Sequence, residues 1–171
     1  MGVLQEYHAA MGVMIFKFEG TVGHFAGDGM MVFFNDPIPR EDHVERAVRM
    51  TLEMREAMQP LKARWSKRGF ELDQGIGIAL GYATIGKIGF EGRLDYSAIG
   101  SVCNLAARLC SEAQGGQILI PHRVAALMDG VMEVEPVGEL TLKGFHKPAP
   151  AYNVVGVKKR TRQVRSAKRS Q

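Results

Sequence analysis

The chain is poor in cysteine and tryptophan and has no long apolar run: 171 residues include two cysteines and one tryptophan. Cys103 and Cys110 lie seven residues apart in a helix-like stretch, which predicts two reduced thiols instead of a secreted disulfide framework. No stretch approaches the roughly 20 apolar residues that span a bilayer. The first residues carry an acid and lack the basic start of a secretory signal. These absences predict a soluble cytoplasmic protein.

The formal net charge of +4 comes from one end of the chain. Residues 157–171 hold seven of the basic residues and no acid, so residues 1–156 carry a net charge of −3. We therefore expect a domain over 1–156 and a basic, disordered tail over 157–171. The tail contacts anionic surfaces weakly at most, and we expect no specific nucleic-acid partner.

The composition of 46% hydrophobic and 23% charged residues is that of a globular domain and argues against wholesale disorder. Apolar residues recur every three or four positions over 3–18 and 41–68, which predicts two helices, the second kinked or broken at Pro60. Two further helices are expected over 100–113 and 121–128. Expected strands span 21–25, 30–34, 94–99, 118–120, 133–137, 139–142 and 151–155, with a strand, turn and strand over 72–88. This order predicts an α+β fold with a largely antiparallel sheet flanked by helices.

Two local features carry candidate chemistry, and each has a plainer interpretation. Asp28, between Gly27 and Gly29 at an expected hairpin tip, is placed to bind a hard cation, although Asp-Gly is also common turn chemistry. Asn104 and Arg108 lie four apart on one helical face, where they suit phosphate binding or form an ordinary solvent-facing pair.

The glycine-rich stretch from Gly75 to Gly81 is spaced GxGxxxG and is not followed by a helix. A dinucleotide loop needs a helix N-terminus to take the pyrophosphate, so this pattern argues against a Rossmann site.

Four segments taken together are similar to a known family: FAGDGMMVFF, GIGIALGYATIGKIG, LDYSAIGSVCNLAARLCSEAQGGQILI and LKGFHKPAPAYNV. In this order and at these separations they resemble the class III adenylyl/guanylyl cyclase catalytic domain, over about residues 4–155. The resemblance implies a ferredoxin-like cyclase fold that converts ATP, or less favourably GTP, to a 3′,5′-cyclic nucleotide and pyrophosphate. It also implies an in-line attack assisted by two Mg²⁺ or Mn²⁺ ions at the interface of a homodimer.

The resemblance assigns roles to matching positions of this chain. Asp28 takes the place of a metal-binding carboxylate, and Asn104 and Arg108 take those of catalytic groups lent by the partner subunit. The same resemblance implies that five residues contact the nucleotide and that one of them, Lys143, lies near the phosphates. These expected nucleotide-binding residues are His24, Phe25, Gly27, Ser97 and Lys143.

Two of these positions correspond to the family's base-selecting pair, where adenylyl members carry Lys and Asp. This chain has His24 and Ser97 there. A hydroxyl at the second position is common among bacterial members with adenylyl activity, and an imidazole can donate to or accept from a purine edge. The resemblance therefore favours ATP over GTP.

The family pattern also includes an opening strand that supplies a first metal-binding carboxylate. This chain begins inside the helix that follows that strand, and its acids before Asp28 are Glu6 and Glu19. We therefore expect an N-terminally truncated cyclase fold that leaves unpaired backbone groups on the strands beside the missing one. We expect its turnover to be weak or lost. The alternative is a catalytically inactive cyclase-like module that dimerises or binds a nucleotide.

Overall fold

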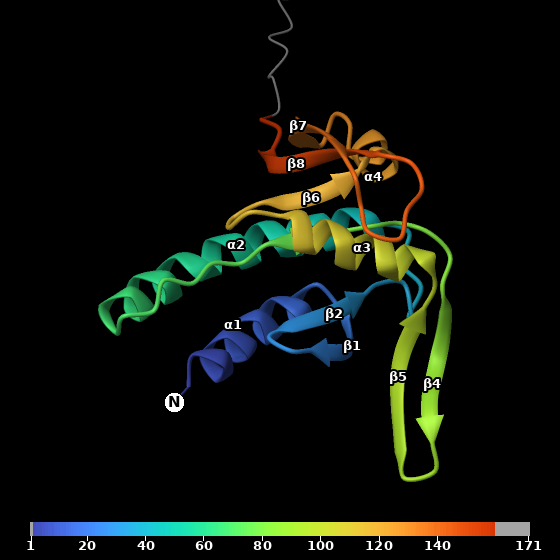
Figure 1. Cartoon of the computed structure of the whole chain (residues 1–171), viewed down its shortest axis with the longest axis horizontal. Coiled ribbons are helices and arrows are strands. Elements are labelled where there is room, and N and C mark those ends of the chain that lie inside the picture. The colour runs from blue at the N-terminus through green and yellow to red at the C-terminus, as the bar shows by residue number, and fades with distance from the viewer. Residues whose placement is uncertain (1, 160–171) are drawn as a thin grey trace, which may run out of the picture.

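A computed structural model describes residues 2–159 and shows helices packed with short sheets (Figure 1). Of the expected basic tail, residues 160–171 lie outside the described part. The helices are α1 (Val3–Lys17), α2 (His43–Lys67), α3 (Ser101–Glu112) and α4 (His122–Leu127). The strands are β1 (Thr21–Ala26), β2 (Gly29–Phe33), β3 (Ile76–Gly77), β4 (Thr84–Phe90), β5 (Arg93–Ile99), β6 (Ile118–Pro121), β7 (Met132–Leu140) and β8 (Ala149–Val157). None of the described helices is both long and apolar enough to cross a membrane.

Helices α1 and α2 lie side by side and bury a shared apolar seam (Figure 1). Met11 and Ile15 are four residues apart on α1, which places both on the face turned toward α2. The facing stripe on α2 follows the same spacing of three and four. It consists of Met50, Met54, Met58, Leu61 and Trp65.

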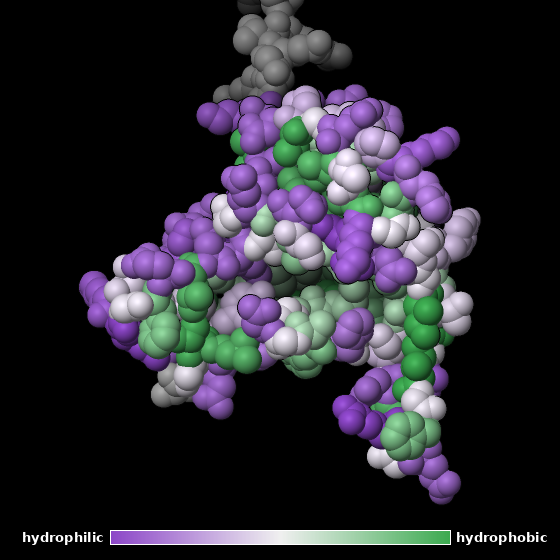
Figure 2. All heavy atoms as spheres, viewed as in Figure 1, coloured by the Kyte–Doolittle hydropathy of each residue, from purple (hydrophilic) through white to green (hydrophobic). Residues whose placement is uncertain are grey.

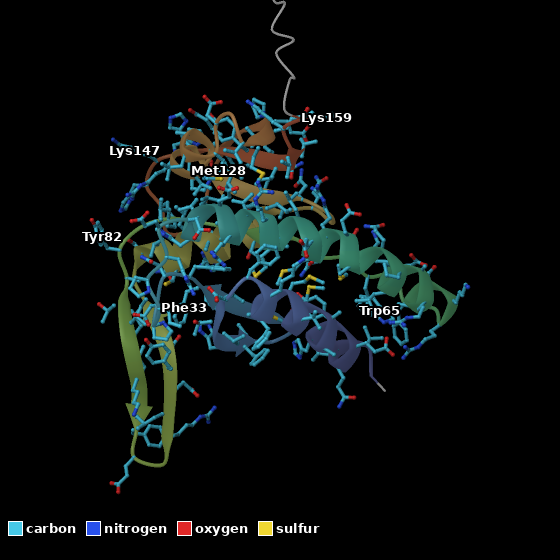
Figure 3. The ribbon with its side chains drawn as sticks, turned by 180° about the vertical axis from the view of Figure 1, so that it is seen from behind. Phe33, Trp65, Tyr82, Met128, Lys147 and Lys159 are labelled. Atoms are coloured by element: carbon cyan, nitrogen blue, oxygen red, sulfur yellow. The ribbon has the colours of Figure 1, made fainter. Side chains whose placement is uncertain are left out.

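Glu6 ties α1 to the last turns of α2. Its Oε2 accepts a hydrogen bond from Nε1 of Trp65 at 2.6 Å, and its Oε1 accepts one from Nη1 of Arg68 at 2.9 Å. The hydrogen bond from Trp65, followed by the hydrogen bond and charge of Arg68, lowers the pKa of Glu6 below its ordinary value. Figure 3 shows Trp65 at the end of α2 that lies far from the β4–β5 hairpin.

The described strands form three sheets. The largest has the order β3-β6-β8-β7, in which β3 and β6 run parallel and the other pairs antiparallel. The other two are the antiparallel hairpins β1–β2 and β4–β5. The expected mixed fold with largely antiparallel pairing is therefore confirmed. Val48 of α2 and Val124 of α4 pack against the inner residues of the large sheet.

The β4–β5 hairpin projects away from the rest of the molecule (Figure 1). At its base, Ser97 and Ala98 are buried, and the Tyr96 hydroxyl donates a hydrogen bond to Asp36 in the loop after β2. Farther out, large apolar side chains are open to solvent. Phe90 is 71% exposed and Leu94 is 58% exposed.

The structure corrects two local expectations and refines a third. Residues expected as two strands, 133–137 and 139–142, form the single strand β7. A bulge between Pro136 and Gly138 shifts the pairing register with β8 without ending the strand. An edge strand tolerates Pro136, since proline lacks the N–H that a second neighbour would need. Helix α2 runs through Pro60 without a break, so the expected break is wrong and a kink at Pro60 stays a prediction.

The glycine-rich segment 72–88 forms the expected strand, turn and strand, although the first strand is short and the second runs on to Phe90. Its first half pairs only at Ile76 and Gly77, and regular pairing resumes at Thr84. Gly77 lies directly against the backbone of α3: a Cβ there would stand 2.3 Å from the carbonyl oxygen of Ala106. The chain therefore uses this glycine for a close helix–strand approach.

Candidate active site

Asp28 occupies the turn between β1 and β2, as the hairpin signal predicted. Gly27 precedes it with φ of 62°, a left-handed conformation that glycine adopts without steric cost. The Asp28 side chain is exposed at the mouth of a cavity. A rigid two-residue turn thus presents one carboxylate to a concave surface.

That cavity, which we call the central groove, has a volume of about 690 Å³. Its long sides are β2 (Gly29–Phe33) and the segment 74–83, which contains β3. Side chains of α2 and α3 complete it. Figure 2 shows a mainly apolar hollow between the part of the molecule that carries α3 and the part that carries β2.

His24 and Ser97 are brought together from strands 73 residues apart in the sequence. Nδ1 of His24 lies 3.2 Å from Oγ of Ser97. His24 is exposed and lines the central groove, whereas Ser97 is buried at the base of the projecting hairpin. The pair joins β1 to β5 and leaves one imidazole edge for another partner.

Phe25 follows His24 on β1 and points to the other side of the strand, since successive side chains alternate. Its ring is 59% exposed and lies against His8 of α1, with ring centroids 4.9 Å apart. Nε2 of His8 is buried with no hydrogen-bond partner among the described residues.

Asn104 and Arg108 lie on a face of α3 that is turned away from the central groove. The residues of α3 that line the groove include Cys103, Ala106 and Cys110, and neither Asn104 nor Arg108 is among the lining residues of the described chain. Asn104 is exposed and Arg108 half-buried. The two residues therefore do not line the groove that Asp28 lines.

Lys143 lies in the loop between β7 and β8. Its neighbour Leu142 is buried in a cluster with Leu109 and Leu119, which anchors the loop against α3. Gly144 follows with φ of 87°, as the expected turn requires. The Lys143 side chain is exposed and does not line the central groove within the described residues.

A polar cluster at the groove was not expected from the sequence. Nε2 of Gln74 donates to the Tyr7 hydroxyl at 2.8 Å, and Sγ of Cys110 donates to the carbonyl of Gly75 at 3.3 Å. Burial raises the pKa of both Tyr7 and Cys110, and the charge of Asp28 adds to each shift. These residues come from three distant segments of otherwise apolar pattern, so no local signal marks them.

The described residues hold no group of three or more His, Cys, Asp or Glu side chains suited to a metal ion. Asp28 fits a single Mg²⁺ or Mn²⁺ ion that takes its remaining ligands from phosphate oxygens and water.

The family is established by sequence. The sequence model of the adenylate and guanylate cyclase catalytic domain matches residues 1–156, so the chain belongs to this family of phosphorus–oxygen lyases. The fold agrees with this family. The chain has the expected α+β cyclase architecture, and the solved cyclase structures that it resembles share it.

Three relatives illustrate the similarity. The chain is 29% identical to "Adenylate cyclase 1" of Rhizobium meliloti over 92% of its own length and 24% of that protein. The crystal structure of the adenylyl cyclase CyaB from P. aeruginosa is 36% identical, with a TM-score of 0.86 over 92% of this chain and 82% of that one. The guanylyl cyclase Cya2 is 30% identical, with a TM-score of 0.80 over 94% and 82% of the respective chains. The chain thus spans about a quarter of the length of its curated relative.

Proposed function

We propose that this chain is the catalytic part of a nucleotide cyclase that converts ATP, in preference to GTP, to a 3′,5′-cyclic nucleotide. The ribose 3′-oxygen attacks the α-phosphorus, the bond from that phosphorus to the bridging oxygen breaks, and pyrophosphate leaves. The 3′-hydroxyl proton passes to solvent. Positioning and charge stabilisation carry such a reaction, which needs no protein nucleophile.

The observation that carries the proposal is the opposite orientation of two sets of residues. Asp28 faces the central groove, while Asn104 and Arg108 lie on the outward face of α3. One chain therefore cannot apply both sets to one nucleotide, but two chains related by a twofold axis can. In this arrangement the guanidinium of one subunit meets a triphosphate held at Asp28 of the other.

The exposed apolar residues of the β4–β5 hairpin support assembly. Phe90 and Leu94 are open to solvent on an element that projects from the body (Figure 1). Apolar surface of this kind is costly to leave in water and marks an interaction site. A second copy that covers it would bring α3 near a partner.

Each remaining residue takes a role that suits its position. Asp28 would hold a divalent cation that neutralises the triphosphate, and Gly27 would let the backbone approach the phosphates closely. Phe25 offers an exposed ring on the side of β1 that faces α1, and Lys143 offers an exposed charge to the phosphates.

His24 and Ser97 would read the purine. Their contact at 3.2 Å gives a fixed pair with one donor or acceptor left for a base edge. The greater identity to the adenylyl cyclase CyaB, at 36%, than to the guanylyl cyclase Cya2, at 30%, supports ATP as substrate.

The experiment measures cyclic AMP and cyclic GMP formed by the purified chain with Mn²⁺ and either nucleotide. We expect a weak basal rate, and Asp28→Ala and Arg108→Ala should each lower it about 100- to 1,000-fold, as loss of one transition-state-stabilising group does. The matched controls Asp129→Ala and Arg49→Ala remove a surface carboxylate and a surface guanidinium elsewhere and should retain the rate. Undiminished turnover in both site variants would refute these roles.

A further inference from the structure

Asp36, in the loop between β2 and α2, is hydrogen-bonded to both strands that carry His24 and Ser97. Its carboxylate oxygen Oδ1 accepts a hydrogen bond from the hydroxyl of Tyr96 on β5. Its main-chain carbonyl accepts one from Oγ1 of Thr21 on β1 at 2.9 Å. Tyr96 directly precedes Ser97, and Thr21 lies three residues before His24. One residue of a loop therefore joins β1 and β5 close to the pair that we propose recognises the base.

The loop that carries Asp36 is fixed by its own contacts. Oδ1 of Asn35 accepts a hydrogen bond from the main-chain N–H of Arg40 at 2.7 Å. The Arg40 guanidinium in turn pairs with Glu19, which follows α1, at 2.8 Å. Asn35 has a φ of 73°, a left-handed conformation that asparagine tolerates because its short side chain bonds locally. The Asp36 carboxylate therefore stands on a loop with a defined shape.

The hydrogen bond from Tyr96 to Asp36 is charge-assisted. Bonds to an ionised carboxylate are shorter and stronger than bonds between neutral groups. This bond, followed by desolvation and the charge of Asp36, raises the pKa of Tyr96 above its ordinary value, so the phenol keeps its proton near neutral pH and remains a donor. The Tyr96 ring also lies against Phe33 of β2, with ring centroids 5.9 Å apart. The side chain is therefore held at both its ring and its hydroxyl.

Strand β1 is irregular directly before His24. Its pairing with β2 shifts register between Val22 and His24, which leaves Gly23 as an extra residue in the ladder. A bulge of this kind bends its strand and changes the direction of the neighbouring side chains. Strand β5 lies against β1 at this point, since a Cβ at Gly23 would stand 3.4 Å from Oγ of Ser97. The direction of His24 therefore depends on where β5 stands.

We infer that Asp36 and Tyr96 are positioning residues for base recognition. Their hydrogen bond holds β5 in place, so that Ser97 keeps the imidazole of His24 in the orientation that prefers ATP to GTP. Tyr96 is not among the residues of the described chain that line the central groove, so it acts through Ser97 and not on the nucleotide. Binding groups discriminate between ligands only when supporting hydrogen bonds hold them within about 0.5 Å of the productive geometry. The inference rests on the proposed function.

The test compares how tightly ATP and GTP bind to the purified chain. Each nucleotide displaces a fluorescent ATP analogue in the presence of Mn²⁺, so the ratio of the two dissociation constants does not depend on turnover. Tyr96→Phe removes only the hydroxyl and keeps the ring against Phe33. We expect this variant to reduce the preference for ATP about two- to tenfold, the range that one hydrogen bond covers. A purely structural role would weaken the binding of both nucleotides alike and leave the ratio unchanged.

Further variants separate the hydrogen bond from general damage to the fold. Asp36→Asn keeps an acceptor oxygen and should retain the preference for ATP, whereas Asp36→Ala should behave like Tyr96→Phe. In a chain that already carries Ser97→Ala, Tyr96→Phe should change the ratio no further, because both residues act through one contact. Tyr152→Phe is the matched control. It removes another tyrosine hydroxyl that lies 3.3 Å from a histidine nitrogen, on β8, and should leave the ratio unchanged.

The outcomes distinguish this inference from the proposed function. A preference for ATP that survives unchanged in Tyr96→Phe overturns the inference and leaves the proposed cyclase function intact. Equal weakening of both nucleotides in that variant assigns the hydrogen bond to folding alone and overturns the inference as well. An unmodified chain that binds neither nucleotide, or binds both equally, contradicts the proposed function or its choice of ATP, and the inference falls with it.

Discussion

Nδ1 of His24 and Oγ of Ser97 lie 3.2 Å apart, although they belong to different hairpins. One residue is exposed at the groove and the other is buried beneath the projecting hairpin. The buried hydroxyl therefore sets the position of the exposed imidazole. This contact therefore joins His24, which we propose recognises the base, to the β4–β5 hairpin.

Ser97→Ala should change base preference more than stability. Loss of one hydrogen bond costs about 0.5–1.5 kcal/mol, which corresponds to a two- to roughly tenfold change in the ratio of kcat/KM for ATP and GTP. The measurement is that ratio, with Ser66→Ala as control, because Ser66 bonds Glu71 at the far end of α2. An unchanged ratio of kcat/KM values would show that the contact between His24 and Ser97 does not select the base.

Mixing two inactive variants should restore activity if the site is composite. In an equal mixture of Asp28→Ala and Arg108→Ala chains, half of the dimers are mixed, and each mixed dimer keeps one intact site of two. We expect about a quarter of the unmodified rate after subunit exchange. Two portions of the same variant are the control, and a mixture as inactive as its components would place both residues in one chain's site.

Glu6→Gln should destabilise the α1–α2 pair in a pH-dependent manner. The folded state lowers the pKa of Glu6, so the carboxylate adds stability above its unfolded pKa, near 4.5, and loses it as pH falls through the lower folded value. The difference in Tm between the unmodified chain and Glu6→Gln should be constant from pH 7 to 6 and shrink below about pH 4.5. Glu56→Gln on the exposed face of α2 should show no such trend.

Gly77→Ala should be strongly destabilising, because its Cβ would meet backbone atoms of α3 at 2.3 Å. Overpacking of this kind costs about 1–3 kcal/mol, or roughly 2–12 °C in Tm for a chain of this size. Gly86→Ala is the matched control, since its Cβ would meet nothing within 4 Å. Thermal unfolding followed by circular dichroism compares the two, and equal Tm values would show that α3 can move away from β3.

Local patterns were sufficient for most elements. The three- and four-residue spacing around Met11 and Met54 predicted α1 and α2, and the glycines beside Asp28 predicted its turn, because these features depend on neighbours in sequence. Cys103 and Cys110 are free in the described chain. The late strands were wrong in detail, since a bulge near Pro136 depends on the partner β8.

By itself the sequence determined the cyclase family, the helices and the turn that presents Asp28. Motif spacing and apolar periodicity depend only on the order of residues along the chain. Only the tertiary structure decided which way Asn104 and Arg108 face, that His24 meets Ser97, and that two strand edges border one groove. These relationships join segments up to 73 residues apart. They follow from how helices and sheets pack against one another, which no local pattern encodes.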